Sequence, residues 1–288
     1  MDDFVHSIIQ GLTVEYPSRN ALNLTALSGA AEFLASIYQS HGIPFESAWY
    51  DDGNGMVRNL IVHQYGLDRT APQIVIGAHY DSVLGTPGAD DNASGVAGVM
   101  DLARRFAQRT CRRPLSFVLF PHEEPPFFLS AKMGSRRYAR SLRDRQEEVY
   151  LMLSLEMIGY ARADQNQHYP FPLMRILGGY PKKANFLAVV GNLRTGVKTR
   201  HLCQAMRKGA SIRIEWLSGP GFLPPLFLSD HSSFWKYGFP AVMITDTAFL
   251  RNPHYHRSTD TTATLNFDFL AEAIAAVETG IRALDAEG

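Results

Sequence analysis

The chain has 288 residues, with 28 basic and 28 acidic side chains, and therefore carries no formal net charge. This length suits a single catalytic domain over residues 1–288, and the 45% of hydrophobic residues can supply a sizeable core. The balanced charge argues against nucleic-acid binding, which needs clustered Lys and Arg side chains. Two cysteines are too few for a disulfide framework, so Cys111 and Cys203 are predicted to be free thiols.

The first residues argue against export and membrane insertion. They read MDDFVHSIIQGL, with two aspartates and a short apolar stretch, whereas a secretory signal needs a basic start and a longer apolar run. No stretch approaches the roughly 18 apolar residues of a membrane span. We therefore expect a cytoplasmic protein without a membrane partner, although a leader trimmed from a secreted precursor would leave no trace. The sequence does not indicate an oligomeric state.

Helices and buried strands are predicted to alternate along the chain. The first helix is expected over residues 21–41, where Gly42 can end it. Continuous apolar runs with many β-branched residues predict strands that are buried on both faces. This alternation predicts an α/β protein, a three-layer α/β/α sandwich around a mostly parallel mixed sheet. The elements expected after the first helix are strands at 59–63 and 73–78, a helix at 94–109, a strand at 115–120, a helix at 131–142, strands at 149–157 and 186–190, a helix at 195–208, strands at 212–216 and 241–245, and a helix at 267–284.

Two polar motifs follow the strand expected at 73–78. In AHYDS (78–82), His79 and Asp81 are two residues apart and point the same way on extended backbone. A neutral imidazole can bind zinc while a nearby carboxylate holds its second nitrogen, but the triplet also fits an ordinary surface loop. In GADDNASG (88–95), two aspartates precede a helix, where a carboxylate can bridge two metal ions or cap the helix N-terminus.

Further acidic side chains follow two later strands. PHEEPPFF (121–128) holds Glu123 and Glu124, of which one can bind metal while the other transfers protons; an ordinary solvated acidic pair is the alternative. The two prolines after the pair fix the backbone that presents it. Glu156 lies near the end of a mostly apolar strand, where a carboxylate is costly to bury unless it is paired or metal-bound.

The last motif, NPHYHRSTDT (252–261), precedes the final helix and offers His254 and His256 with Tyr255 between them. Ligands in this kind of fold gather at the carboxyl ends of the strands, which is where most of these side chains fall. A mixture of imidazole and carboxylate ligands suits zinc at a hydrolytic site with open positions. The sequence therefore predicts a metal centre at that edge of the sheet.

The ordered motifs AHYDS, GADDNASG, PHEEPPFF, SLEMIGY, SDHSSFW and NPHYHRSTDT resemble those of the co-catalytic dizinc aminopeptidase family, which includes the bacterial leucyl-type zinc aminopeptidases. The same family contains glutamate carboxypeptidase-like enzymes and the glutaminyl cyclases. The resemblance runs from about Ala21 to the C-terminus. It implies a zinc-peptidase fold and a dizinc metallo-aminopeptidase, which hydrolyses the N-terminal residue from a peptide or aminoacyl substrate.

The resemblance also implies which residues bind the metals. Two zinc ions are expected in each chain, and Asp91 would bridge them. A cis peptide bond is expected directly after this aspartate. Many relatives have aspartate where this chain has Glu156. The implied ligands are His79, Asp91 and Glu156 for one zinc, and Asp91, Glu124 and His256 for the other.

Three further residues are implied to act in catalysis. Glu123 would be the general base, Tyr255 would stabilise the tetrahedral intermediate, and Asp81 would orient the first histidine ligand. Asp230 in SDHSSFW would have a supporting role, and His122 has no assigned role.

Two other functions compete with an aminopeptidase. The first is a glutaminyl-peptide cyclotransferase with one zinc, but that branch tends to carry tryptophan just before the last histidine, where this chain has Tyr255. The second is a metal-free binding module, which would be expected to have lost ligands. For the aminopeptidase, a medium or large apolar first residue is expected, because PPFFL (125–129) and FLPPLFL (222–228) can supply an apolar pocket, although both segments equally fit the core.

Overall fold

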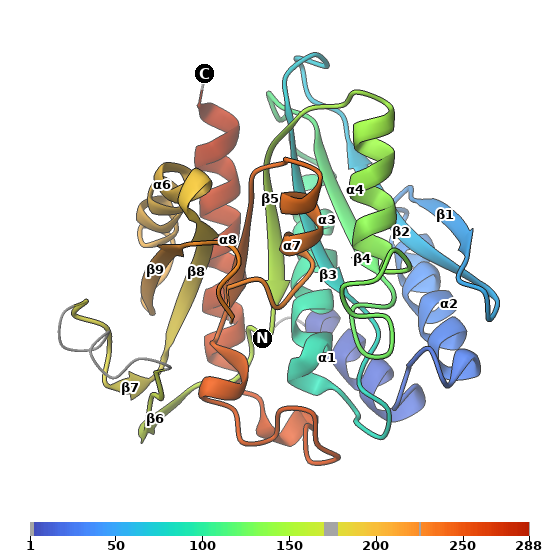
Figure 1. Ribbon diagram of the computed structural model, residues 1–288, viewed down its shortest axis with the longest axis horizontal. Helices are drawn as coiled ribbons and strands as arrows, with labels where there is room; N and C mark the ends of the chain where they lie inside the picture. The colour runs from blue at the N-terminus through green and yellow to red at the C-terminus, as the bar shows by residue number, and fades with distance from the viewer. Residues whose placement is uncertain (1–2, 170–177, 225, 288) are drawn as a thin grey trace.

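A computed structural model describes residues 3–169, 178–224 and 226–287. Its centre is an eight-stranded sheet in the order β1-β2-β4-β3-β5-β10-β8-β9 (Figure 1). The four central strands β4, β3, β5 and β10 run parallel to one another. Their bounds are Leu115–Phe120 for β4, Gln73–His79 for β3, Val149–Glu156 for β5 and Ala241–Thr245 for β10.

Antiparallel pairing appears on both sides of this parallel centre. β2 pairs antiparallel with β1 and β4, and β8 pairs antiparallel with β10. The sheet is thus mixed and mostly parallel, as predicted. The outer strands are β1 (Glu46–Asp51), β2 (Met56–Gln64), β8 (Phe186–Asn192) and β9 (Arg213–Gly219), and a separate small sheet is formed by β6 (Arg162–Asn166) and β7 (Lys183–Ala184).

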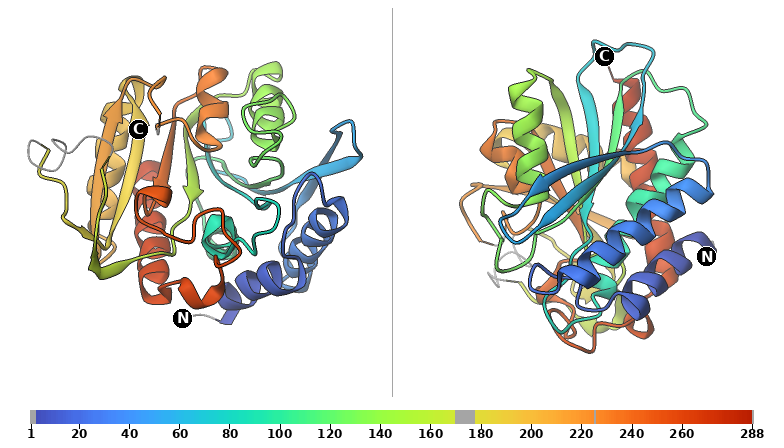
Figure 2. Two further views of the ribbon diagram at one scale, coloured as in Figure 1. Left: turned by 60° about the horizontal axis from the view of Figure 1, so that its bottom comes forward. Right: turned by 90° about the vertical axis from the view of Figure 1, so that its right-hand side faces the viewer.

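Helices cover both faces of the sheet, which gives the expected three layers (Figure 2). Of the α-helices in the described ranges, five lie on one side and two lie on the other. The first group is α1 (Asp3–Gln10), α2 (Leu24–Ser40), α3 (Gly95–Phe106), α6 (Gly196–Met206) and α8 (Phe267–Ala286). The second group is α4 (Gly134–Asp144) and α7 (His231–Lys236).

The core follows the two-residue period of the strands. In β3, Ile74 and Ile76 pack into the core on the side of α3 and α8, while Val75 packs on the side of α4 and α7. All three side chains are fully buried. Because both faces of the central strands are covered, their sequences are continuously apolar and their polar residues are confined to the strand ends.

Most predicted elements are present, with shifts at their ends. The first helix begins at Leu24 because the Asn23 side chain accepts from the N–H of Ala26 at its N-terminus. The helix expected from residue 131 begins at Gly134. Both cysteines are free, as predicted, and both are buried. In the described part of the chain, every helix is too short or too polar to cross a membrane.

Candidate metal centre

The carboxyl ends of three neighbouring strands place polar side chains at one edge of the sheet. His79 is the last residue of β3 and Glu156 is the last residue of β5. Glu123 and Glu124 follow shortly after β4. Because parallel strands end at the same edge, residues that lie far apart in sequence meet there. The polar side chains therefore cluster at the ends of the strands, while the strands themselves remain apolar.

Asp91 joins two groups of these side chains. Its Oδ1 lies 3.5 Å from Nε2 of His79, and its Oδ2 lies 3.2 Å from Nε2 of His256. Glu156 completes the first group, and Glu124 completes the second. Each carboxylate oxygen of Asp91 therefore faces a different histidine, which is the arrangement needed to bridge two cations. The structure brings together all five residues that the sequence singled out as ligands.

The spacing of these atoms fits tetrahedral zinc. Ligand atoms held about 2.0–2.1 Å from a tetrahedral zinc ion lie about 3.3–3.4 Å from one another. Nε2 of His79 lies 3.3 Å from Oε2 of Glu156, and Nε2 of His256 lies 3.5 Å from Oε2 of Glu124. These separations are longer than good hydrogen bonds but agree with shared coordination.

Two polar atoms of the cluster also lack a hydrogen-bond partner among the described residues. Within the described chain, Nε2 of His79 and Oε1 of Glu124 are buried without a hydrogen bond. Burial raises the pKa of Glu124 well above its usual range, and the charges of Asp91 and Glu123 raise it further. A bound divalent cation would reverse this effect, because it favours ionised carboxylates. The donor set therefore fits zinc.

Asp81 organises the cluster through the main chain as well as through His79. Nδ1 of His79 lies 3.2 Å from the carbonyl oxygen of Asp81 and 3.5 Å from its Oδ1. The same carboxylate accepts the main-chain N–H groups of Glu123 at 3.2 Å and Glu124 at 3.0 Å. Asp81 thus fixes the first histidine and the glutamate pair together.

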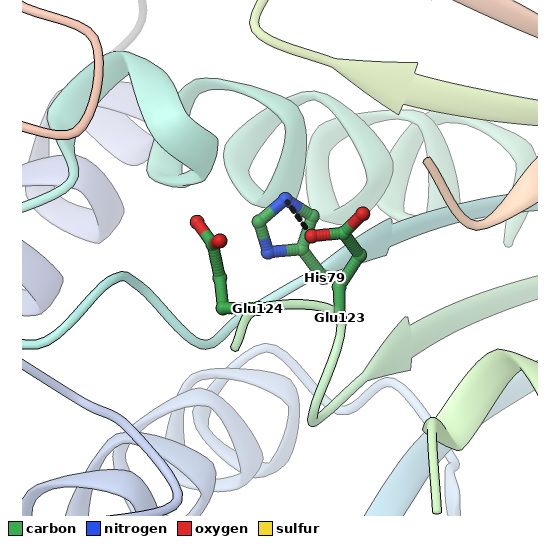
Figure 3. Close-up of side chains that lie close together, drawn as sticks. All are labelled: His79, Glu123 and Glu124. Carbon is green, nitrogen blue, oxygen red and sulfur yellow. Dashed lines mark ion pairs between the residues drawn. The ribbon is translucent and has the colours of Figure 1, made fainter. Parts of the chain in front are cut away.

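The adjacent glutamates lie on either side of the His79 ring (Figure 3). Glu124 reaches towards the group that contains His256, whereas Oε2 of Glu123 lies 3.9 Å from Nε2 of His79. Burial raises the pKa of Glu123 well above its usual range; the positive charge of His79 opposes the shift, and the charge of Glu156 adds to it. His79, Glu123 and Glu124 form a third possible metal group. By its position, Glu123 could therefore bind metal as well as transfer protons.

Tyr255 lies between the metal centre and an apolar cavity. Its ring stacks on His256, with centroids 3.7 Å apart and an angle of 20° between the ring planes. Burial raises the pKa of the Tyr255 phenol, and the nearby charges of Asp91 and Glu124 raise it further, so the hydroxyl keeps its proton. The side chain is therefore a hydrogen-bond donor at the edge of the centre.

The apolar cavity has a volume of about 340 Å³ and reaches Glu156 at the metal centre. Of the segment 222–228, in which residue 225 lies outside the described residues, Leu223, Pro224, Leu226 and Leu228 line the cavity, whereas residues 125–129, all described, do not. Of the two segments that could supply a pocket, PPFFL therefore contributes nothing to this cavity. The apolar lining includes Phe186, Ala188, Val190, Leu226, Met243 and Phe249.

Other polar residues of the motifs have different positions. The carboxylate of Asp90 turns away and accepts from the N–H of Gly159 at 2.9 Å and from Nδ2 of Asn252 at 2.7 Å. His254 lies outside the metal groups, with Nδ1 2.9 Å from Oγ1 of Thr259. Asp230 is fully buried, and burial raises its pKa to about 7.

Two supporting residues were not anticipated. The Asn92 side chain donates to the carbonyl of Leu155 at 2.8 Å and accepts from the N–H of Met157 at 3.0 Å. It therefore binds the main chain on both sides of Glu156. The Asp260 carboxylate accepts from the N–H of Asp91 at 3.1 Å. Asp260 lies in the last motif, but its spacing gives no sign of this contact. The bond between Asp91 and Asn92 is cis, as the resemblance implied.

The sequence profile of Peptidase family M28 matches residues 59–279, which is most of the chain. The chain belongs to this family. It is 39% identical over 280 residues to the uncharacterized protein YfbL of Escherichia coli K12, an alignment that covers 94% of this chain and 84% of that protein. The resemblance to the zinc aminopeptidases and their relatives is therefore confirmed at the level of the family.

Solved structures show the same fold. The LapA aminopeptidase of Legionella pneumophila has a TM-score of 0.76 and 22% identity, over 100% of this chain and 71% of that one. A Tannerella forsythia glutaminyl cyclase has a TM-score of 0.68 and 17% identity, over 99% and 98% of the two chains. Several more distant relatives are named as leucine aminopeptidases, and the chain spans about half of their length. The M28 metallopeptidase fold is thus shown, and specificity must be argued from the site.

Proposed function

We propose that this protein is a zinc-dependent aminopeptidase that holds two zinc ions. The observation that carries the proposal is the placement of Asp91, whose two oxygens face His79 and His256 separately. A single-zinc reaction would need only one of these groups. His79 and Glu156 would hold one ion with Asp91, and Glu124 and His256 would hold the other.

Zinc, when bound, supplies Lewis-acid activation of water and of the peptide carbonyl. The chain supplies the proton transfers. Glu123 would accept a proton from the attacking water and deliver it to the leaving amine. A general base works best when its pKa lies near the ambient pH, and burial raises the pKa of Glu123 in that direction. The Tyr255 hydroxyl would donate a hydrogen bond to the carbonyl oxygen as negative charge develops there.

The apolar cavity supports cleavage after a single large apolar residue. Glu156 belongs both to a metal group and to the cavity lining. A side chain that fills the cavity would therefore bring the adjacent carbonyl to the metal centre. A volume of about 340 Å³ accommodates leucine or phenylalanine side chains. The proposed substrates are peptides or aminoacyl compounds with a free α-amino group and such a first residue.

A panel of aminoacyl-arylamides and glutaminyl peptides, assayed with and without zinc, tests the proposal. We expect zinc-dependent release of leucine and phenylalanine, with little release from N-acetylated analogues. Cyclisation of glutaminyl peptides without hydrolysis would favour the cyclotransferase instead. Faster turnover of acetylated or acidic substrates would contradict the proposed specificity.

A further inference from the structure

Arg19 lies wholly inside the protein and bonds to two loops that carry metal ligands. Its Nε donates to the carbonyl of Tyr80 at 2.6 Å, and its Nη2 donates to the carbonyl of Gly88 at 2.8 Å. Tyr80 directly follows His79, and Gly88 lies shortly before Asp91. One guanidinium group therefore connects the loop of the first histidine with the loop of the bridging aspartate.

Asn20 extends these connections to the glutamate pair. Its Nδ2 donates to the carbonyl of Ser82 at 2.9 Å and to the carbonyl of Pro125 at 3.2 Å. Pro125 directly follows Glu124. The main chain joins in, because the N–H of Ser82 donates to the carbonyl of Arg19 at 2.9 Å. Two consecutive residues thus contact all three loops that hold His79, Asp91 and Glu124.

The guanidinium group also places a fixed positive charge behind the carboxylates. Burial lowers the pKa of Arg19 to about 10, and the charges of Asp81, Asp260 and Asp91 oppose this shift. Arg19 therefore stays protonated at neutral pH. It can lessen the mutual repulsion of the carboxylates while no metal is bound, which keeps the loops in place.

We propose that Arg19 and Asn20 form a positioning pair that sets the spacing of the two metal groups. Arg19 donates in several fixed directions at once, which a lysine ammonium on a flexible stem cannot reproduce. The pair belongs to none of the metal groups, so it acts through the three loops and through the charge of Arg19. This inference rests on the proposed zinc centre but does not require the peptidase reaction.

Zinc affinity of variants tests the pair. The variants are Arg19→Lys, which keeps the charge, and Asn20→Ala, which removes the amide. Competition with a chromogenic chelator gives the dissociation constant of each zinc, and urea unfolding of the zinc-free proteins gives their stability. We expect Arg19→Lys to weaken zinc binding by about 10- to 100-fold, the usual effect of losing a group that orients metal ligands. Asn20→Ala should act mainly on the zinc held by Glu124.

Arg113→Lys is the matched control. Arg113 is also buried and donates to main-chain carbonyls, including that of Glu287 at 2.7 Å, but it lies at the opposite edge of the sheet. Its replacement should lower stability and leave zinc affinity unchanged. Equal loss of zinc affinity in the control would show a general effect of lower stability and overturn the proposal.

The remaining outcomes are also decisive. Wild-type affinity for both ions in Arg19→Lys and Asn20→Ala would overturn the positioning pair while leaving the proposed function intact. If Arg19→Lys does not fold, Asn20→Ala decides alone. Wild-type protein that binds no zinc would overturn both the proposed function and this inference.

Discussion

Nε2 of His122 lies 2.7 Å from Oδ2 of Asp52, and both side chains are buried. Asp52 belongs to the turn between β1 and β2, where its other oxygen accepts from the N–H groups of Asn54 and Gly55. His122 directly precedes Glu123 and has a left-handed φ of 68°. The contact between His122 and Asp52 therefore connects the turn of the β1–β2 hairpin to the segment that carries Glu123 and Glu124. This contact gives His122 a structural role, which its motif did not indicate.

Replacing Asp52 should destabilise the protein. In Asp52→Ala the His122 ring loses a buried partner and the turn loses its acceptor, so the free energy of unfolding should fall by about 2 kcal/mol, the usual cost of leaving buried polar groups without partners. Urea denaturation measures this change. The neighbouring Asp51 is exposed, and Asp51→Asn should change stability by less than about 0.5 kcal/mol. Equal effects of the two substitutions would show that the buried contact is unimportant.

Metal removal and reconstitution should show that each chain binds two zinc ions. Protein purified without chelator and reconstituted with zinc should hold two ions, because two ligand groups share Asp91. Zinc in hundredfold excess over its dissociation constant should stabilise the fold by about 2.7 kcal/mol per site. Elemental analysis and thermal unfolding, before and after chelation, measure both quantities. A stoichiometry of one or zero after reconstitution would rule out the dizinc centre.

The motif residues were predictable because the strands are strongly marked. β3 and β4 are continuously apolar, so the polar residues after them stand out as strand ends. The sequence could not choose between Asp90 and Asp91 without the family resemblance, because both fit a bridge or a cap. The structure separates them by contacts: Asp90 binds Gly159 and Asn252, whereas Asp91 faces the two histidines.

The supporting residues could not be predicted, for a physical reason. Arg19 is bonded to main-chain carbonyls more than 60 residues away. Carbonyl groups are present at every residue and leave no mark in the sequence. The Asp52 contact with His122 likewise depends on an edge strand, β1, that was not predicted. Such contacts emerge only once the sheet order brings distant loops together.

Stability of the metal-free protein should fall as pH rises towards 8. Burial raises the pKa of Asp230 and of Asp260 to about 7, whereas a carboxyl group in the unfolded chain titrates near pH 4. From pH 4 to above 7 the folded protein therefore retains protons that the unfolded chain has lost, so unfolding becomes easier as pH rises. Burial lowers the pKa of His79, but the charges of Glu156 and Glu123 outweigh this effect and raise it overall. His79 therefore also makes stability fall as pH rises.

One group opposes this trend at lower pH. Burial lowers the pKa of His231 to about 4, which makes stability rise with pH up to about 6.5, where an unfolded histidine titrates. The net fall should therefore be clearest from pH 6.5 to 8. Urea unfolding of chelated protein at several pH values measures it, with zinc-loaded protein as the control that should show a weaker trend. A gain in stability over this interval would contradict the expected protonation.

Filling the apolar cavity should change substrate preference. Ala188 lines the cavity from β8, so Ala188→Phe should occupy the space of a large substrate side chain. We expect kcat/KM for leucyl- and phenylalanyl-arylamides to fall about tenfold or more, with a smaller loss for alanyl-arylamide. Ala188→Ser is the control of similar size. A uniform loss for all three substrates would place the substrate side chain elsewhere.

Glu123→Gln should abolish turnover and leave both metals bound. Glu123 and Glu124 are adjacent, but the proposed mechanism gives them different work. An amide at position 123 keeps the shape of the side chain but cannot accept a proton from water, and general base catalysis typically contributes about 10²- to 10⁴-fold. Glu124→Gln should instead weaken the zinc site that contains His256.

Because His79, Glu123 and Glu124 also form a possible metal group, activity and zinc content must be measured together in both variants. Near-full activity of Glu123→Gln, or loss of zinc from it while Glu124→Gln keeps both ions, would reverse the assignment of base and ligand.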